Sequence, residues 1–476
     1  MSATDILAIL PIIIAAASAV AVMVLITFYR DHMLTLLLTI AGLAAAFGAL
    51  SVASAKIPLH VTTLLIIDGY ALFYMGLLFA AGLAVALLSY GYLEGREGDH
   101  EEFYLLLLLA VTGSAVLVSA AHFASFFLGL EILSVALYTL IAYLRTSGRG
   151  NEAGIKYLVL AAVSASFLLF GMALVYAGSG TMEFAEIAKK AAGNEFSLLL
   201  VAGFILIVTG IGFKLALVPF HMWTPDVYEG APAPVSAFIA TVSKGAVLAL
   251  LLRYFAGLDV RGSQTLFVIF TVASVSSMFV GNLLALLQRN VKRILAYSSI
   301  AHLGYLIVAF LSGREMAATA VGYYLVAYFV TMLGAFGVVT VMSGKDRDAD
   351  SLEDYRGLAS RRPWLAGIFT AMLLSLAGIP LTAGFIGKFY VVAAGAGSAL
   401  WLLVIMLVVN SAIGLFYYLR IVMILFEEEG EPIKGLPPVS FSGGLVLALL
   451  TLLLFWFGIY PAHLARLIQA AAAGFI

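Results

Sequence analysis

The feature that most constrains this chain is a series of long apolar segments, each about the length of a helix that crosses a membrane. Of its residues, 63% are hydrophobic and 11% are charged, whereas a soluble domain carries about 25% charged residues. About 20 mainly apolar residues form one helical crossing. By this criterion we predict fourteen spans, at 5–28, 33–54, 70–93, 103–120, 123–144, 154–177, 197–218, 235–256, 264–287, 293–312, 317–342, 363–396, 400–425 and 440–460. The expected fold is an all-α polytopic membrane protein.

The connections between these spans are short. The longest polar ones cover 94–102, 178–196, 343–362 and 427–439. None is long enough for a separate soluble domain, so residues 1–476 are expected to form one membrane domain. Lys and Arg are more frequent in the loops after odd-numbered spans, which predicts that these loops are cytoplasmic and that both termini are periplasmic. The first span lacks a basic leader, so we expect a retained helix rather than a cleaved signal peptide.

Two of the spans are interrupted by proline. Span 7 carries Lys214 and then Pro219, and span 12 carries Pro380 and then Lys388. The two interrupted spans are five apart, and a unit with an odd number of helices that is repeated head to tail inserts its second copy upside down. We therefore predict two inverted five-helix repeats. They comprise spans 4–8 (103–256) and spans 9–13 (264–425), with 1–93 and 440–460 as additions.

Five ionisable side chains remain inside the predicted spans once the loop charges are set aside. They are Glu131, Lys156, Lys214, Lys244 and Lys388. A charge in hydrocarbon costs about 2.5–3.5 kcal/mol on insertion scales, so such residues usually mark a pathway for ions or protons. The alternative for the lysines is packing against backbone carbonyls. Lys156 lies only one turn into its span, where snorkelling to the surface fits equally well.

The chemistry of this set favours protons over metal cations. Burial lowers the pKa of a lysine from about 10.4 towards neutral pH, and a nearby carboxylate raises it again. A pair between Glu131 and a lysine that forms and separates would therefore load and unload a proton. Hard metal cations need several oxygen ligands, and Glu131 is the single carboxylate deep inside the predicted spans, since Asp5 lies at the very start of the first one. We expect no metal site.

Polar side chains near the interrupted spans are candidate relay groups. His221 follows Pro219; with an ordinary pKa of about 6.5 it could relay protons, or it could only satisfy carbonyls freed by the break. His302 lies in span 10 with Tyr297 nearby, where a relay role and interhelical hydrogen bonding are both compatible. Aromatic residues near span ends, predicted to form interfacial belts, are Trp364, Trp401, Tyr417 and Tyr418.

Composition also excludes several kinds of site. The chain contains no cysteine, which excludes disulfides, thiolate-held iron–sulfur clusters and cysteine nucleophiles. Its formal net charge of −1 gives no indication of a nucleic-acid partner. The sequence contains no phosphate-binding loop, dinucleotide fingerprint, haem ligand pair or nucleophile elbow.

Three stretches carry a resemblance to a known family. They are GFKLALVPFHMWTPDVYEGAPAPVSAF (212–238), NVKRILAYSSIAHLGY (290–305) and SLAGIPLTAGFIGKFYV (375–391). They closely resemble the antiporter-like subunits of bacterial proton-pumping NADH:quinone oxidoreductase, respiratory complex I. The likeness covers essentially the whole chain, and the wording TPDVYEGAPAPVS is specific to subunit N of that group. The resemblance implies fourteen helices, with helices 7 and 12 broken, in the membrane arm of the complex.

The same resemblance implies roles for matching positions. Glu131 would be the conformationally coupled carboxylate of helix 5, with Lys156 of helix 6 as its partner. Lys214 would be the central lysine of helix 7. Lys244 would be the connecting residue of helix 8, and Lys388 the outlet-side lysine of helix 12.

The resemblance further implies the surroundings of the chain. It would lie in the bacterial inner (plasma) membrane beside subunits K and M, in contact with lipid, and it would move protons. NADH, FMN, the iron–sulfur clusters and the quinone, such as ubiquinone, would bind to other subunits of this translocating enzyme. Two alternatives stay open. One is a cation/proton antiporter subunit of the Mrp type, and the other is a scaffold that only transmits conformational change.

Overall fold

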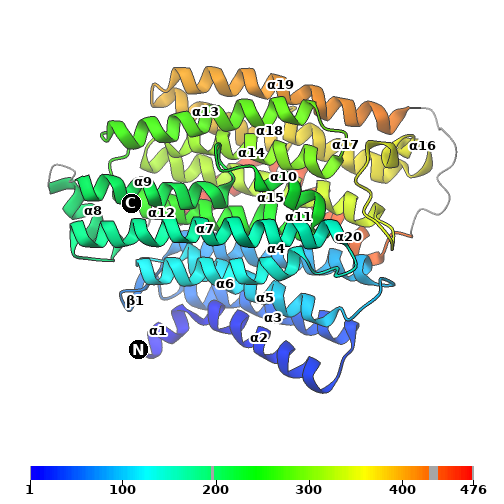
Figure 1. Cartoon of the computed structure of the whole chain (residues 1–476), viewed down its shortest axis with the longest axis horizontal. Coiled ribbons are helices and arrows are strands. Elements are labelled where there is room, and N and C mark those ends of the chain that lie inside the picture. The colour runs from blue at the N-terminus through cyan, green and yellow to red at the C-terminus, as the bar shows by residue number, and fades with distance from the viewer. Residues whose placement is uncertain (1, 194–197, 428–437, 474–476) are drawn as a thin grey trace.

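The computed structural model describes residues 2–193, 198–427 and 438–473, and Figure 1 shows the bundle of helices that they form. Thirteen helices in this described part are long and apolar enough to cross a membrane. Two shorter apolar helices cover Pro363–Ala377 and Ala383–Gly397. The prediction of an all-α polytopic membrane protein is therefore confirmed. The predicted loop 427–439 lies largely outside the described residues.

The helices and strands follow in chain order. The first half contains α1 (Ala3–Ala8), α2 (Leu10–Phe28), α3 (His32–Ser54), β1 (Leu59–Val61), β2 (Leu65–Ile67), α4 (Gly69–Leu93), α5 (Glu101–Val118), α6 (Phe123–Ile141), α7 (Gly148–Ser179), α8 (Phe184–Gly193), α9 (Leu198–Leu215), α10 (Trp223–Gly230), α11 (Ala233–Phe238), the π-helical turn η1 (Ile239–Ser243) and α12 (Lys244–Ala256). The second half contains α13 (Gln264–Leu286), α14 (Val291–Phe310), α15 (Arg314–Met342), the 3-10 turn η2 (Leu352–Tyr355), α16 (Leu358–Arg361), α17 (Pro363–Ala377), α18 (Ala383–Gly397), α19 (Trp401–Phe426), α20 (Phe441–Ile459) and α21 (Pro461–Ala472).

Several of these elements were not predicted from the sequence. The antiparallel β1–β2 hairpin and the amphipathic helices α8 and α21 lie between or beyond the predicted spans. The proline-rich stretch after Pro219, which lies outside the predicted spans until residue 235, contains helix α10. Its Pro225 is the third helical residue, within the first turn, where a backbone N–H has no intrahelical partner to lose.

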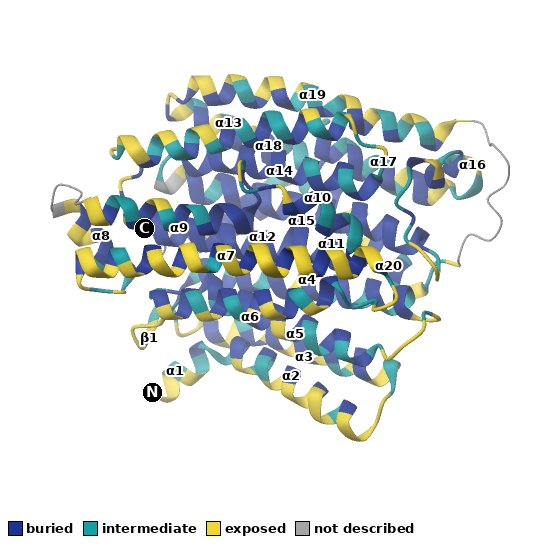
Figure 2. Cartoon of the chain, in the orientation of Figure 1, coloured by how far each residue is buried: buried dark blue, intermediate teal, exposed yellow. Residues whose placement is uncertain are grey.

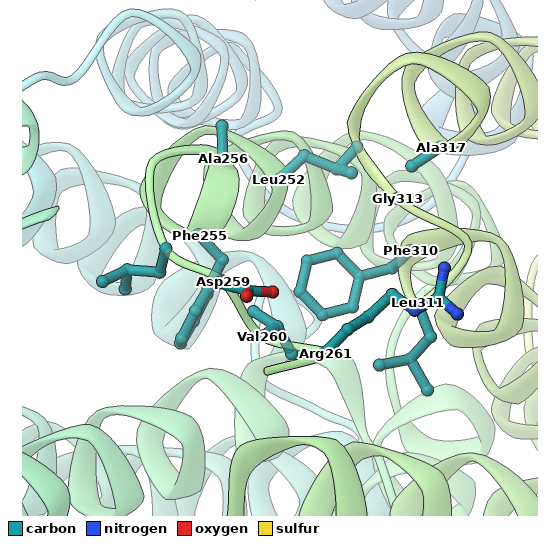
Figure 3. A pocket seen from close by; sticks show the side chains of 11 residues that line it. Leu252, Phe255, Ala256, Asp259, Val260, Arg261, Phe310, Leu311, Gly313 and Ala317 are labelled. Carbon is teal, nitrogen blue, oxygen red and sulfur yellow. The ribbon is translucent and has the colours of Figure 1, made fainter. Parts of the chain in front are cut away.

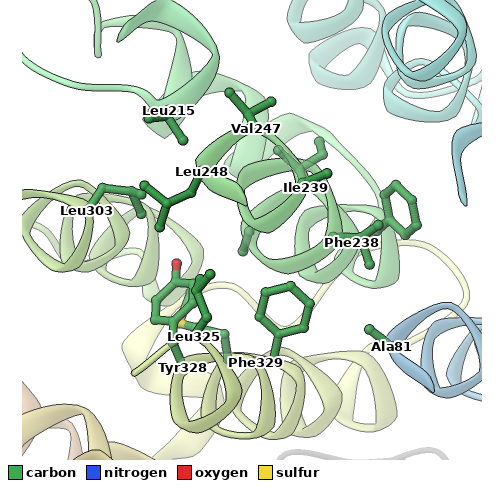
Figure 4. Close-up of a cluster of buried hydrophobic side chains, with 14 of the residues drawn as sticks. Ala81, Leu215, Phe238, Ile239, Val247, Leu248, Leu303, Leu325, Tyr328 and Phe329 are labelled. Atoms are coloured by element: carbon green, nitrogen blue, oxygen red, sulfur yellow. The ribbon is translucent and has the colours of Figure 1, made fainter. Parts of the chain in front are cut away.

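Two long spans occupy the centre of the molecule. The segment Ala233–Ala256 (α11, η1 and α12) and most of α15 are buried along their whole length, whereas α7 and α19 expose one side. Figure 2 shows this contrast as a dark interior between exposed outer helices. Between the two central spans, apolar side chains such as Phe238, Leu248 and Phe329 pack together (Figure 4). Groups carried by these spans are therefore shielded from lipid and water.

Both chain termini lie at the same end of the helices, beside α8 and the β1–β2 hairpin (Figure 1). The opposite end carries α16 and the connection from α15 to α17. A chain that crosses a membrane an even number of times must have this arrangement. Which end faces the cytoplasm stays a prediction.

A buried ion pair fastens the start of α4 to the centre of the bundle. Asp68 caps α4 by accepting from the Ala71 N–H at 2.7 Å. Its two carboxylate oxygens also accept from Arg253 of α12 at 3.0 and 2.8 Å, and Arg253 donates to the carbonyl of Val118 at 3.1 Å. Both side chains are buried. The expectation of five ionisable groups within the spans is therefore incomplete, because Arg253 lies inside α12.

Asp68→Ala is expected to destabilise the chain by about 3–5 kcal/mol, because a buried guanidinium loses the carboxylate that neutralises it. Asp31→Ala is the matched control, since Asp31 caps α3 at the Leu34 N–H (2.7 Å). Losing such a cap alone costs about 0.5–2 kcal/mol. Denaturant titration of the purified chain measures both losses. Equal destabilisation by the two substitutions would show that the ion pair adds nothing.

Candidate functional site

Three buried lysines on three different helices are held in the same manner. Lys214, Lys244 and Lys388 expose 4%, 1% and 9% of their surface. Each Nζ donates to a serine hydroxyl: Ser134 for Lys214 (2.7 Å), Ser299 for Lys244 (2.8 Å) and Ser411 for Lys388 (2.7 Å). Each Nζ also lies 5.3 Å from the centroid of a tyrosine ring: Tyr157 for Lys214, Tyr228 for Lys244 and Tyr305 for Lys388. We call this shared arrangement the serine–tyrosine cradle.

The serine–tyrosine cradle is electrically neutral. Among the described residues, none of the three lysines forms an ion pair with a carboxylate; their polar contacts are to hydroxyls and, for Lys388, to a carbonyl. The negative face of an aromatic ring attracts a cation within about 6 Å, by roughly 2 kcal/mol or more when water is excluded. The cradle thus holds the ammonium without the full compensation of a carboxylate. The charged form of each amine is therefore stabilised less than it would be beside a carboxylate.

Lys214 lies in the last turn of α9, where the helix breaks. The Ala216 N–H donates to the Phe213 carbonyl at 2.9 Å, and the Leu217 N–H to the Gly212 carbonyl at 2.8 Å. This is the Schellman ending of a helix, and it requires a left-handed residue. Here Ala216 takes that conformation, with φ +58°. The chain then passes Pro219 before α10 begins.

The second break lies between α17 and α18, and Lys388 lies beyond it in α18. The Gly378 N–H donates to the Ser375 carbonyl at 3.0 Å, and the Ile379 N–H to the Leu374 carbonyl at 3.0 Å, which is again a Schellman ending. Gly378 supplies the left-handed conformation with φ +88°. Lys388 reaches back and donates to the carbonyl of Ala377, the last residue of α17, at 2.8 Å. A cation at a helix C-terminus is favoured by the helix dipole.

Glu131 faces the lysine of the first break. It lies on α6 one turn before Ser134, the cradle serine of Lys214, so that both side chains project from one face of α6. Its charge acts electrostatically on Lys214 across this gap. The Oε1 atom is buried and has no hydrogen-bond partner among the described residues. The structure therefore places Glu131 and Lys214 together as a separated pair rather than a closed one.

Lys156 does not have the partner that the resemblance implied. On α7 it pairs with Glu152 at 2.7 Å and with Asp226 of α10 at 2.9 Å, rather than with Glu131. Arg293 of α14 donates to the same Asp226 at 2.9 Å. The side chain of Lys156 is 44% exposed. The predicted pairing is therefore wrong in this structure, and Lys156 instead ties α7 to the half-helix α10.

The predicted relay groups have different surroundings. His221 is buried in the break between α9 and α10, and its Nδ1 has no hydrogen-bond partner among the described residues. Tyr297 is half-buried on α14. His302, also on α14, lies between two tyrosine hydroxyls: Tyr324 contacts its Nδ1 at 2.7 Å and Tyr418 its Nε2 at 3.1 Å. The structure thus brings His302 into a hydrogen-bond network.

Tyr417 and Tyr418 were predicted to belong to an interfacial belt, and this prediction is wrong. Both are about 1% exposed. The Tyr417 hydroxyl donates to Asn282 Oδ1 at 3.0 Å, whereas the Tyr418 hydroxyl contacts Ser298 and His302. Sequence position near a span end does not reveal this, because α19 turns these side chains towards α13 and α14.

A fourth buried lysine, Lys292, shows the alternative to the serine–tyrosine cradle. Its Nζ donates to Asp348 and to the carbonyl of Ala231, each at 2.7 Å. Burial alone would raise the pKa of Asp348, but the charge of Lys292 and the hydroxyl of Tyr92 lower this pKa below its ordinary value of 3.8. Lys292 was expected in a loop, and its burial was not predicted. It fastens the loop after α15 to the joint between α10 and α11.

Two cavities open at the ends of the bundle. One of about 820 Å³ lies at the end opposite the termini, and charged residues such as Arg96, Glu229 and Asp348 line much of it. The other, of about 190 Å³, lies at the C-terminal end of α12, where Phe255 and Phe310 face Arg261 (Figure 3). None of the three cradled lysines lines either cavity.

Comparison with known proteins agrees with this architecture. The family model described as "NADH:quinone oxidoreductase/Mrp antiporter, TM" matches residues 120–414. NADH-quinone oxidoreductase subunit N of Ectopseudomonas mendocina is 49% identical, and that of Nitrosospira multiformis 54%; both matches cover 99% of this chain and 97% of the relative. A chain of respiratory complex I from Thermus thermophilus, solved with bound aureothin, is 32% identical with a TM-score of 0.83, covering 96% of this chain and 98% of that one.

The similarity therefore spans both interrupted helices and the three cradled lysines, over nearly the full length of each curated relative. The chain belongs to the NADH:quinone oxidoreductase/Mrp antiporter membrane family, and within it to subunit N of NADH-quinone oxidoreductase.

Proposed function

We propose that this chain translocates protons across the membrane, driven by electron transfer from NADH to quinone in other subunits of the complex. The groups that exchange the proton are Glu131, Lys156, Lys214, Lys244 and Lys388, supported by His221, Tyr297 and His302. The observation that carries the proposal is the serine–tyrosine cradle, repeated at three buried lysines. A membrane protein retains such costly groups where charge must pass, and a neutral cradle keeps each amine able to release its proton.

Lys156 has a distinct part in this proposal. Because Asp226 on α10 accepts from both Lys156 and Arg293, a change in the protonation of this cluster alters how the half-helix α10 is held. The coupled change at Glu131 reaches Lys214 through their electrostatic attraction. We thus assign Lys156 to the control of the broken helix and the three cradled lysines to carrying the proton.

The proposed topology has fourteen crossings. The pair α17–α18 supplies one crossing in addition to the thirteen longer helices among the described residues. Residues 103–256 and 264–425 would form inverted five-helix repeats, with 1–93 and 440–460 as additions to the single domain. The matching Schellman endings at Ala216 and Gly378 support this relation, because one local geometry interrupts the fourth helix of each unit.

The proposed setting follows from the relatives. The chain would lie in the membrane arm, next to subunits K and M, in the bacterial inner membrane with both termini periplasmic. FMN, the iron–sulfur clusters and the sites for NADH and quinone would belong to other subunits. The absence of cysteine agrees with this assignment for the iron–sulfur clusters, whose usual ligands are cysteine thiolates.

Two other functions were considered. An Mrp-type cation/proton antiporter subunit has the same family model, but identity of 49% and 54% to subunit N over nearly the whole chain favours the oxidoreductase. A scaffold that moves no proton would need only rigid packing, for which buried ammonium groups in neutral surroundings are a poor choice. Lys292, which forms an ion pair with Asp348, is an example of a buried lysine with a structural role in this chain.

Lys214→Met and Lys388→Met each remove one amine and retain an unbranched side chain. In the assembled complex, each is expected to lower NADH:quinone turnover by about tenfold or more, equivalent to at least about 1.4 kcal/mol, and to lower the number of protons moved per electron pair. Lys189→Met is the control, since Lys189 is exposed on α8. Vesicle acidification measured together with NADH oxidation provides both quantities. Unchanged proton yield in both test variants would favour the scaffold.

Glu131→Gln retains the shape of the side chain and removes its charge. We expect the complex to assemble and its turnover to fall, because the attraction that couples α6 to Lys214 is lost. Glu186→Gln, at an exposed carboxylate of α8, controls for the loss of one negative charge. Native gels and NADH oxidation are the measurements. Full activity in an assembled Glu131→Gln complex would remove Glu131 from the coupling mechanism.

A further inference from the structure

His302 is held at both ring nitrogens by tyrosine hydroxyls from two other helices. Tyr324 of α15 contacts Nδ1 at 2.7 Å, and Tyr418 of α19 contacts Nε2 at 3.1 Å. All three side chains are buried. In a neutral imidazole one nitrogen donates a hydrogen bond and the other accepts one. The tautomer of His302 therefore sets the direction of the hydrogen bonds on both sides of the ring.

Tyr418 extends this arrangement back along α14. Its hydroxyl also hydrogen-bonds to Ser298, which is four residues before His302 and lies on the same face of the helix. The next residue, Ser299, receives the hydrogen bonds of Lys244 at 2.8 Å and of Tyr328 at 2.7 Å. The series Ser298–Tyr418–His302–Tyr324 thus begins one residue along α14 from the serine that holds Lys244.

The other end of the series approaches the second helix break. A cavity of about 10 Å³ is lined by His302, Tyr324, Thr331, Ser375 and Gly384. This is close to the smallest volume that holds one water molecule. Gly384 belongs to α18, which carries Lys388, and the charge of Lys388 acts on His302. The series therefore spans the region between two cradled lysines.

We propose that Tyr418 and Tyr324 are relay residues that pass protons through His302 between the surroundings of Lys244 and the α17–α18 break. This inference rests on the proposed function and adds two residues, Tyr418 and Tyr324, to those named there. In the starting state of the relay, the Ser298 hydroxyl donates a hydrogen bond to Tyr418 and the Tyr418 hydroxyl donates one to Nε2 of His302. The Nδ1–H of His302 donates to Tyr324.

Each transfer in this relay balances. A proton added at Ser298 lets that serine give its own hydrogen to the Tyr418 oxygen, while Tyr418 gives its hydrogen to Nε2. His302 releases the Nδ1 hydrogen to the Tyr324 oxygen, and Tyr324 releases its own into the cavity beside Ser375. One proton enters, one leaves, and His302 ends as the other tautomer. Reversal of the tautomer, with rotation of the hydroxyls, restores the starting state.

The neighbouring residue Tyr417 provides an internal control. A buried tyrosine hydroxyl needs a hydrogen-bond partner in any case, so burial alone does not indicate a relay. Tyr417 is as buried as Tyr418 and is on the same helix, but its hydroxyl donates to Asn282 rather than to the histidine. Phe in place of either tyrosine removes one hydroxyl and leaves the ring.

The test compares Tyr418→Phe with Tyr417→Phe in the assembled complex. We expect Tyr418→Phe to lower proton translocation and turnover by about 100-fold or more, within the range for a positioned proton-transfer group. Turnover of that variant should also slow more in D₂O than that of the parent, while the KM for quinone is unchanged. Tyr417→Phe should lower both quantities much less than Tyr418→Phe, because the Tyr417 hydroxyl lies beside Tyr418 and Ser298 but does not contact His302. Ser298→Ala removes the other end of the same hydrogen bond and should resemble Tyr418→Phe.

Other outcomes overturn the relay. Equal turnover and equal D₂O sensitivity in Tyr418→Phe and Tyr417→Phe, with both complexes assembled, would make Tyr418 a packing residue. If Tyr418→Phe fails to assemble, parental pumping by Ser298→Ala overturns the relay, and a loss of pumping there supports it. Lys388→Met separates the two levels of the argument. If both Lys214→Met and Lys388→Met pump fully, the proposed function fails as a whole; if they do not pump but Tyr418→Phe does, only the relay fails.

Discussion

The structure depends on how three ammonium groups are accommodated in an apolar interior. Each ammonium group donates a hydrogen bond to one serine hydroxyl and lies over the ring of one tyrosine. Among the described residues, no carboxylate forms an ion pair with any of them. Water cannot be replaced fully by such a neutral shell, so the charged form of each amine stays costly. In the proposed function, this residual cost makes the proton of each amine available for transfer. A closer carboxylate would stabilise the charged amine and hold its proton.

Lys292 demonstrates this within the same chain. It is as buried as Lys244, yet Asp348 and the Ala231 carbonyl bind its amine directly. The charge of Lys292 helps to hold the pKa of Asp348 below its ordinary value. Lys292 is therefore a fixed tie between a loop and a helix joint, whereas Lys244, equally buried, has no carboxylate partner among the described residues and is the one we propose to exchange a proton. The partners, rather than the residue type or its depth, decide the role.

The helix breaks bring the cradles together. A continuous helix has no free carbonyl within the membrane, but the ending of α17 leaves the Ala377 carbonyl for Lys388. Lys214 lies immediately before the other break, opposite Glu131. Between these two points, α14 contributes Ser298, Ser299 and His302 from a fully buried stretch. The proposed proton route thus depends on α14, whose polar residues form hydrogen bonds with several neighbouring helices.

Hydropathy and proline are local properties, so the sequence alone determined the all-α membrane class, the interruption of span 12 near Pro380 and the identity of the three central lysines. It did not determine their partners. Whether Lys156 pairs with Glu131 or Asp226, or whether Tyr418 faces lipid or His302, depends on how helices more than 60 residues apart rotate against each other. Hydrophobicity is nearly uniform around these helices, so it gives no sign of the side that packs inward. Only the tertiary structure decided which neutral groups surround each charge.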